Sequence, residues 1–142
     1  MATMTTLRAS CRRLIARTAL GRERGSSSIQ MVILMPALFS IMFLGMQGAL
    51  YYHARTVAIA AAQEGARAAG SQNGTAGDGI SAASSFVSDA GGKDVLPGAH
   101  ITGARSATTA TVRVTGTSLS VIPGWSPAVS QSASMPVERI TR

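Results

Sequence analysis

The stretch that decides the fold runs from Ile29 to Tyr52 and reads IQMVILMPALFSIMFLGMQGALYY. It carries no formal charge and is rich in Ile, Leu, Met and Phe. At about 1.5 Å of rise per residue, a helix of this length spans roughly 36 Å, which suffices to cross a hydrocarbon core of about 30 Å with some tilt. We therefore predict one transmembrane helix. The alternative is a buried helix of a soluble protein, but a chain of 142 residues offers little to cover it on all sides.

Basic residues gather in front of this apolar stretch. The chain holds 13 Lys and Arg against 6 Asp and Glu, and the arginines of the leader are Arg8, Arg12, Arg13, Arg17, Arg22 and Arg24. Basic flanks stay in the cytoplasm, and Tyr51 and Tyr52 suit the opposite interface. The pattern predicts a single-pass protein of the inner membrane, in contact with membrane lipid, with a cytoplasmic N-terminus. Nucleic acid is not an expected partner, because the charge precedes a membrane span instead of alternating with aromatic residues on a folded face.

A cleaved secretory signal is a second interpretation of residues 1–52, since Ala60–Ala62 offers small residues that suit a signal peptidase. The apolar stretch is longer than the usual central region of about 7 to 15 residues and contains Gln47, which favours a retained anchor. Pro36 lacks a backbone donor and is expected to kink the helix or to end its first segment.

Small residues within the span mark a candidate surface for helix–helix packing. Gly45 and Ala49 form a small-xxx-small pair, with Gly48 beside them, and such pairs let two helices approach closely. Lipid-facing filler is the alternative, because the pattern is common in apolar helices.

The residues before the span resemble a prepilin processing site. Arg22-Glu23-Arg24-Gly25 is followed by Ser26-Ser27-Ser28 and then by the hydrophobic stretch. The resemblance implies that a prepilin-type leader peptidase cuts after Gly25 and leaves Ser26 as the new N-terminus. A charged leader resists crossing the bilayer and would hold Gly25 at the cytoplasmic face. The alternative is a flexible turn in front of an uncleaved signal anchor.

A second motif strengthens the resemblance and names a family. Residues 60–69 read AAAQEGARAA, so Gln63, Glu64, Gly65 and Arg67 follow the span in an Ala-rich context. A Gly-Ser junction, an apolar helix with an early Pro and this stretch, in that order, resemble the TadE-like family. That family implies a pilin-like component of tight-adherence (Tad) pilus systems, with other pilin-like subunits or secretion platform proteins as partners.

One position departs from the pilin-like pattern. The fifth residue after the implied cut is Gln30, where pilin-like precursors usually carry Glu. The family's Glu is thought to pair with the N-terminal amine of a subunit, which offsets the cost of charge in lipid. Glutamine is cheaper to bury but only forms hydrogen bonds, so it leaves such an ammonium unneutralised.

The C-terminal part reads as a small α+β domain. The small residues of 54–69 repeat at helical spacing, which predicts a stalk that packs against the domain or against a neighbour's stalk. Gly70–Gly79 reads as a linker, and Asp78 as the cap of a short helix that ends at Gly91 and Gly92. Its packed face is expected to hold Ile80, Ala83, Phe86 and Val87.

An antiparallel sheet of three or four strands is expected to cover this helix. The candidate strands are His100–Ala104, Thr109–Thr117, Leu119–Ile122 and Ala133–Val137. Val112 and Val114 would face the helix, and Thr111, Arg113 and Thr115 would face solvent. Pro123-Gly124 predicts a turn, and Trp125 beside it is expected in the core, with an exposed binding aromatic as the alternative.

No residue pattern predicts catalysis, a cofactor or a metal. Cys11 is the single cysteine, and His53 and His100 stand far apart without further ligands at suitable spacing. The acids Glu64, Asp78, Asp89, Asp94 and Glu138 each have a local explanation as a stalk charge, a cap or a loop residue.

The sequence therefore predicts three parts. Residues 1–25 form a basic leader that is cleaved, 26–70 form the transmembrane helix and stalk, and 71–142 form an extracytoplasmic domain. The predicted function is that of a membrane-anchored, pilin-like minor subunit supporting Tad-type pilus assembly or secretion, and not an enzyme. The alternative is an unprocessed, signal-anchored envelope protein whose outer domain binds or senses a partner.

Overall fold

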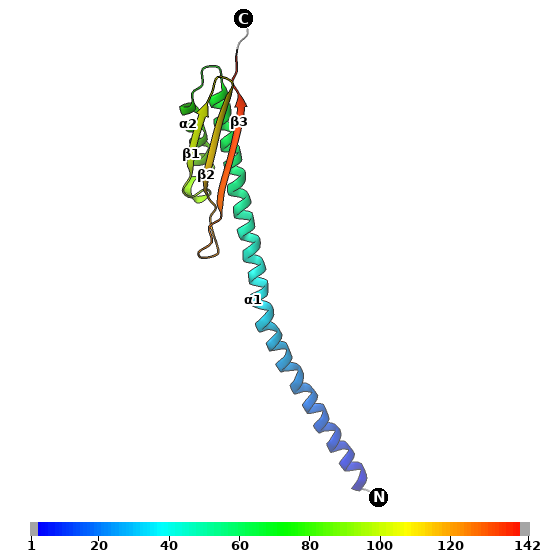
Figure 1. Cartoon of the computed structure of the whole chain (residues 1–142). Coiled ribbons are helices and arrows are strands. Elements are labelled where there is room, and N and C mark those ends of the chain that lie inside the picture. The colour runs from blue at the N-terminus through cyan, green and yellow to red at the C-terminus, as the bar shows by residue number, and fades with distance from the viewer. Residues whose placement is uncertain (1–2, 140–142) are drawn as a thin grey trace. The chain divides into compact units, whose positions relative to one another are not determined.

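The computed structural model describes the backbone from residue 3 to residue 139 and the side chains from residue 28 to residue 139. The chain forms an α+β fold, as predicted, and divides into two compact units, one ending at Met42 and one starting at Phe43. Figure 1 shows the elements, which are α1 (Thr3–Gly70), α2 (Ala76–Asp89), the 3-10 helix η1 (Gly92–Asp94), β1 (His100–Arg105), β2 (Thr109–Thr117) and β3 (Ala128–Pro136).

The described part of the first unit consists of helix α1 alone. The side chains of residues 28–42 are exposed, including those of Ile, Leu, Met and Phe. Helix α1 continues through Pro36, so of the two effects expected of this proline the end of a first segment is wrong, and a kink stays a prediction. Among the described residues, Ser28–Gly70 is long and apolar enough to cross a membrane, and its most apolar window has a mean hydropathy of 2.1 with none of it buried.

The second unit is built on a three-stranded antiparallel sheet in the order β1-β2-β3. In the register of these strands, His100 pairs with Thr115 and Thr109 pairs with Pro136. Along β2 the alternation is as predicted, since Val112 and Val114 are buried while Arg113 is exposed. The buried face of the sheet therefore has to be covered by the two helices.

Small residues of α1 supply that cover. The core joins residues of the helices and strands with Leu96 of the segment after η1, and its members are Ala54, Ala58, Ala61, Ala62, Ala83, Val87, Leu96, Val112, Val114 and Val129. Alanine lets the helix backbone come close to the sheet, where larger side chains would hold it away. The predicted packing of the stalk against its own domain is present in the structure. Packing against a neighbour's stalk stays a prediction.

Two glycines set the distance between α1 and α2. A Cβ added at Gly65 would lie 2.6 Å from the carbonyl oxygen of Gly79, and one added at Gly79 would lie 2.7 Å from that of Gly65. Both contacts are with backbone atoms, which cannot swing away as the end of a flexible side chain can. The two helices therefore touch backbone to backbone at this pair.

Helix α2 begins earlier than predicted. Its N-cap is Thr75, not Asp78, and Asp78 is the third helical residue of a capping box. The Thr75 backbone N–H donates to Asp78 Oδ2 at 2.8 Å, and the Asp78 N–H donates to Thr75 Oγ1 at 3.1 Å. These reciprocal bonds stabilise the first turn across Gly77, so the expected linker over Gly70–Gly79 shortens to residues 71–75.

The pKa of the Asp78 carboxyl is lowered from its usual value. The main cause is the hydrogen bond from the Thr75 side chain, followed by the bond from the Thr75 backbone, and the positive charge of Arg105 adds to both. The ionised form of Asp78 is therefore the form that stabilises the helix start.

Three further expectations for this domain need correction. Leu119–Ile122 is not a strand, because Ser120 accepts the Ile122 N–H and donates to its carbonyl, which curls the backbone. The last strand is longer than predicted and already begins at Ala128. Phe86 lies outside the packed face of α2 and is 36% exposed, since the sheet is covered by the smaller Ala83 and Val87.

The close contact between Gly65 and Gly79 predicts that alanine is tolerated less well at Gly65 than at Gly77, which lies outside this contact. Gly65→Ala places a Cβ against the Gly79 carbonyl and is expected to lower the free energy of unfolding by about 1–3 kcal/mol. Gly77→Ala meets only Thr75 Oγ1 at an ordinary 3.5 Å and is expected to leave stability unchanged or to raise it by less than about 1 kcal/mol. Thermal unfolding of the detergent-solubilised chain measures both, and equal effects would contradict the close contact.

The capping box predicts a pH dependence with a defined sign. Because the folded-state pKa of Asp78 is lowered, its contribution is present above its unfolded pKa, near about 3.9, and is lost as the pH falls through the folded value. Asp78→Asn is expected to be less stable than the unsubstituted chain at about pH 7, and the gap should close below about pH 4. Unfolding curves across this range test it, with Asp89→Asn at the other end of α2 as the control. A gap that is independent of pH would contradict the role of the charge.

Candidate functional site

The loop that joins β2 to β3, residues 118–127, lies against α1 at the end of its apolar stretch. The Ser118 N–H donates to the Pro127 carbonyl at 2.9 Å, which closes the base of the loop. At its tip the Trp125 N–H donates to the Ile122 carbonyl at 3.2 Å, around Pro123 and a Gly124 with φ of +80°. Pro and then Gly at the two central positions are typical of a type II turn, so this predicted turn is confirmed.

The amide of Gln47 holds this loop to the helix. Gln47 Nε2 donates to the Leu119 carbonyl at 3.1 Å, and Gln47 Oε1 accepts the Val121 N–H at 3.0 Å. The Ser120 hydroxyl adds a longer bond to the same oxygen at 3.3 Å. Gln47 is only 2% exposed, and both the nitrogen and the oxygen of its amide have partners in the loop.

From the sequence alone, Gln47 indicates only that residues 1–52 are a retained anchor and not a cleaved secretory signal. The feature that could have indicated its role is a lone amide in an uncharged helix, since a buried amide needs partners with both donors and acceptors. The identity of those partners, more than seventy residues later in the chain, had no trace in the local pattern.

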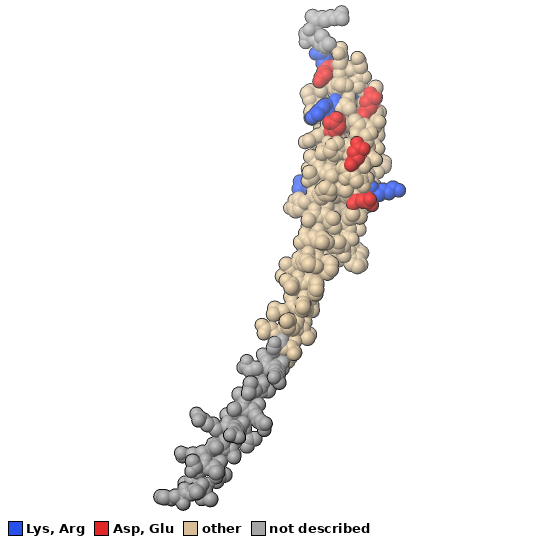
Figure 2. Space-filling model, turned by 180° about the vertical axis from the view of Figure 1, so that it is seen from behind, with Lys and Arg blue, Asp and Glu red and all other residues tan. Residues whose placement is uncertain are grey.

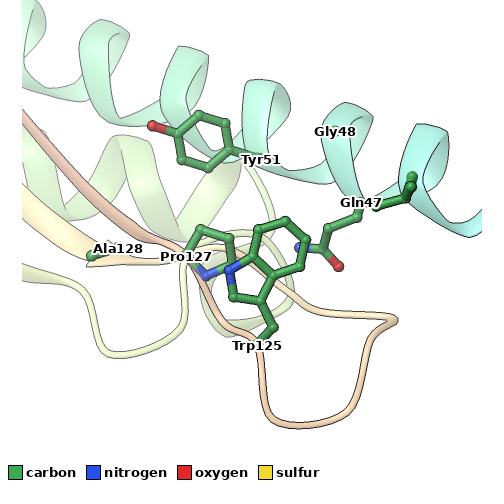
Figure 3. A pocket seen from close by; sticks show the side chains of 7 residues that line it. Gln47, Gly48, Tyr51, Trp125, Pro127 and Ala128 are labelled. Carbon is green, nitrogen blue, oxygen red and sulfur yellow. The ribbon is translucent and has the colours of Figure 1, made fainter.

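An apolar groove of about 320 Å³ opens between the loop and α1, within the second unit. Figure 3 shows the Trp125 ring reaching from the loop toward the helix, between Gln47 and Tyr51. The lining residues are Leu44, Gln47, Gly48, Tyr51, Trp125, Pro127 and Ala128. The prediction that Trp125 is a core residue is wrong, because the ring is 49% exposed and the core beneath the sheet is filled by Leu96 and the valines of β2 and β3.

The predicted helix–helix packing residues do not contact another element closely. A Cβ added at Gly45 or Gly48 would meet nothing within 4 Å among the described residues, and Ala49 is exposed. Gly48 also lines the groove beside Trp125. Packing of these residues against the helix of another protein stays a prediction.

The stalk motif, which consists of Gln63, Glu64, Gly65 and Arg67, contains both buried and exposed residues. Gly65 is buried at the contact with α2, whereas Gln63 is exposed. Glu64 and Arg67 form an ion pair, with 3.4 Å between Arg67 Nη1 and Glu64 Oε2, but both side chains are exposed and the pair contributes little to stability.

The residues of the implied leader junction lie elsewhere. Gly25 and Ser26 fall outside the part of the chain whose side chains the structure describes, and Gln30 is exposed on α1. Among the described residues, no group of three or more His, Cys, Asp and Glu side chains is arranged to hold a metal ion.

A known protein family matches one segment that contains both the apolar helix and the stalk. Residues 25–67 match the family model described as TadE-like protein. The chain carries a TadE-like segment. The match starts at Gly25 of the leader junction and ends at Arg67 of the stalk motif, and it contains the apolar helix on which the resemblance also rests. No curated protein and no solved structure matches the chain.

The TadE-like segment and the exposed apolar helix together indicate a membrane-anchored, pilin-like protein associated with Tad pili. The segment ends before α2 and the sheet, so the family match does not extend to the part of the chain that carries the 118–127 loop.

The clamp on the loop predicts a local effect of substituting Gln47. Gln47→Leu leaves the Leu119 carbonyl and the Val121 N–H without their partner and is expected to lower the free energy of unfolding by about 1–3 kcal/mol. Amide hydrogen exchange of the 118–127 loop should accelerate, while exchange in β2 stays slow.

Ser40→Ala is the matched control, because the Ser40 hydroxyl donates only to the Pro36 carbonyl of its own helix at 2.7 Å. If both variants exchange in the loop at the same rate as the unsubstituted chain, Gln47 does not hold the loop.

Proposed function

We propose that this chain is a pilin-like minor subunit that supports Tad-type pilus assembly or secretion from the inner membrane. The observation that carries the proposal is the TadE-like match over residues 25–67, which joins the leader junction, the apolar helix and the stalk motif in one segment. The exposed large hydrophobic side chains of α1 fit such a role, because they need lipid or other helices to cover them.

The proposal includes an orientation. The arginines of residues 1–25 stay in the cytoplasm and the domain with the sheet lies outside, with the tyrosines at the end of the span in the outer interface. A prepilin-type leader peptidase removes residues 1–25 at the cytoplasmic face. The mature chain then starts at Ser26 and carries its α-amino group at the start of the membrane helix.

Gln30 bears on the kind of subunit. A carboxylate at this position would neutralise the new ammonium, but an amide only donates and accepts hydrogen bonds. A subunit with Gln30 is therefore costlier to pack repeatedly in a helical filament core, which favours a minor component over the bulk pilin. Other pilin-like subunits or platform proteins are the expected partners, with Gly45, Gly48 and Ala49 as the helix–helix contact.

The proposed activity is protein association and not catalysis. Because the Ala-rich stalk packs inside the chain's own domain, we expect partners to contact α1 before residue 54 and the outer surface of the domain. The competing function is that of an unprocessed, signal-anchored envelope protein with an outer domain that binds or senses a partner.

Processing distinguishes the two functions. The full chain, produced in cells with a prepilin-type leader peptidase and extracted from the membrane, is expected by intact mass to start at Ser26, and to keep its leader in cells without the peptidase. Gly25→Leu should block the cut, since the peptidase acts after glycine in pilin-like precursors. Gly21→Leu, a glycine of the same leader, is the matched control and should be processed normally. An intact leader in the presence of the peptidase would favour the signal-anchored alternative.

A further inference from the structure

Charge is distributed unevenly over the second unit. Residues 43–54 of α1 and residues 114–137 carry no Asp, Glu, Lys or Arg, whereas Arg55 follows immediately after the first of these segments. Figure 2 shows charged side chains of the second unit together in the upper part of the view. The two uncharged segments meet where Gln47 holds the 118–127 loop.

Exposed hydrophobic side chains gather on the same two segments. Within the described part of the second unit, every large exposed hydrophobic residue except Phe86 lies on them, and these residues are Phe43, Leu44, Met46, Tyr52, Leu119 and Trp125. A soluble protein would bury such a cluster or use it as a contact surface. The groove between Trp125 and Tyr51 extends this apolar surface inward.

The position of the loop along α1 decides what covers this surface. The loop contacts the helix at Gln47, one turn after the exposed Leu44 and one turn before Tyr51. These turns form the end of the apolar stretch that is proposed to cross the bilayer, and Tyr and Trp rings favour the boundary between lipid and water. The surface of the bilayer that α1 is proposed to cross therefore lies at the level of the loop.

Part of the loop backbone is already hydrogen-bonded, which lowers the cost of entering such a boundary. Of the eight residues of the loop that carry an N–H group, four have a partner within the unit, and these are Ser118, Val121, Ile122 and Trp125. Backbone groups that are already bonded lose little when water is withdrawn, whereas free ones would cost several kcal/mol in lipid.

We propose that the 118–127 loop is a second membrane contact, in which Leu119 and Trp125 enter the interface of the bilayer beside α1 and an acyl chain occupies the groove between Trp125 and Tyr51. Gln47 joins this contact to the membrane helix. Two attachments restrict how the sheet domain tilts against the membrane surface. The inference requires that α1 crosses a membrane, but it does not require assembly into a pilus.

Trp125 is the only tryptophan of the chain, so its fluorescence reports on this loop alone. The full chain is reconstituted into vesicles of phosphatidylethanolamine and phosphatidylglycerol, with a fraction of phosphatidylcholine brominated either near the headgroup or near the end of the acyl chain. We expect quenching of Trp125 by both lipids, stronger from the bromine near the headgroup, and weak quenching by iodide in the water. The quenching should persist when the protein is diluted with more lipid.

Leu119→Asp is expected to abolish most of the quenching by brominated lipid and to increase quenching by iodide, because a carboxylate resists entry into the interface. Phe86→Asp is the matched control, since Phe86 on α2 is 36% exposed against 38% for Leu119, and it should leave both signals unchanged. The result for the unsubstituted chain decides the inference even if Leu119→Asp fails to fold.

Three results would overturn the inference. Strong iodide quenching without quenching by brominated lipid would place the loop in water. Shielding of Trp125 from both quenchers that disappears on dilution with lipid would show that a second copy of the chain covers the groove. Failure of the chain to float with the vesicles would remove the membrane anchor itself, and the inference with it.

Discussion

The constraint on which the structure depends is the change in side-chain size along one helix. Before Gln47, α1 presents large apolar side chains that nothing in the described chain covers, and from Ala54 to Ala69 the side chains facing the sheet are mostly alanine. Large side chains suit a lipid environment that adapts its shape, whereas small ones suit a sheet and a second helix that must approach closely. A single element thus supplies both an anchor and one wall of a folded domain.

Gln47 lies on α1 between the large apolar side chains and the alanines. A buried amide in an apolar helix is costly unless each of its groups finds a partner, and the backbone of the 118–127 loop provides partners for both the donor and the acceptor. The position of Trp125, the groove beside it and the exposed surface next to α1 all follow from this attachment. The TadE-like match over residues 25–67 precedes the loop, so the membrane-anchored, Tad-associated character of the chain does not derive from it.

Local patterns predicted much of the second unit because their physics is local. The alternation around Val112 and Val114 follows from the two-residue period of a strand, and the turn at Pro123-Gly124 follows from the backbone angles that these two residues favour. The start of α2 was predicted wrongly at Asp78, because only the reciprocal hydrogen bonds between Thr75 and Asp78 decide which of the two lies outside the helix. The error at Leu119–Ile122 has a similar origin, because the Ser120 hydroxyl bonds both the N–H and the carbonyl of Ile122 and curls the backbone.

The sequence by itself determined the membrane segment, the TadE-like order of junction, helix and stalk, and the α+β class, because each depends on residues close together in the chain. Only the tertiary structure decided the close contact of Gly65 with Gly79, the partners of Gln47 and the exposure of Trp125. These features join residues that lie far apart along the chain, and a pattern along the sequence contains no distance between such residues. Their energies come from close packing and from paired polar groups, which exist only once the segments have met.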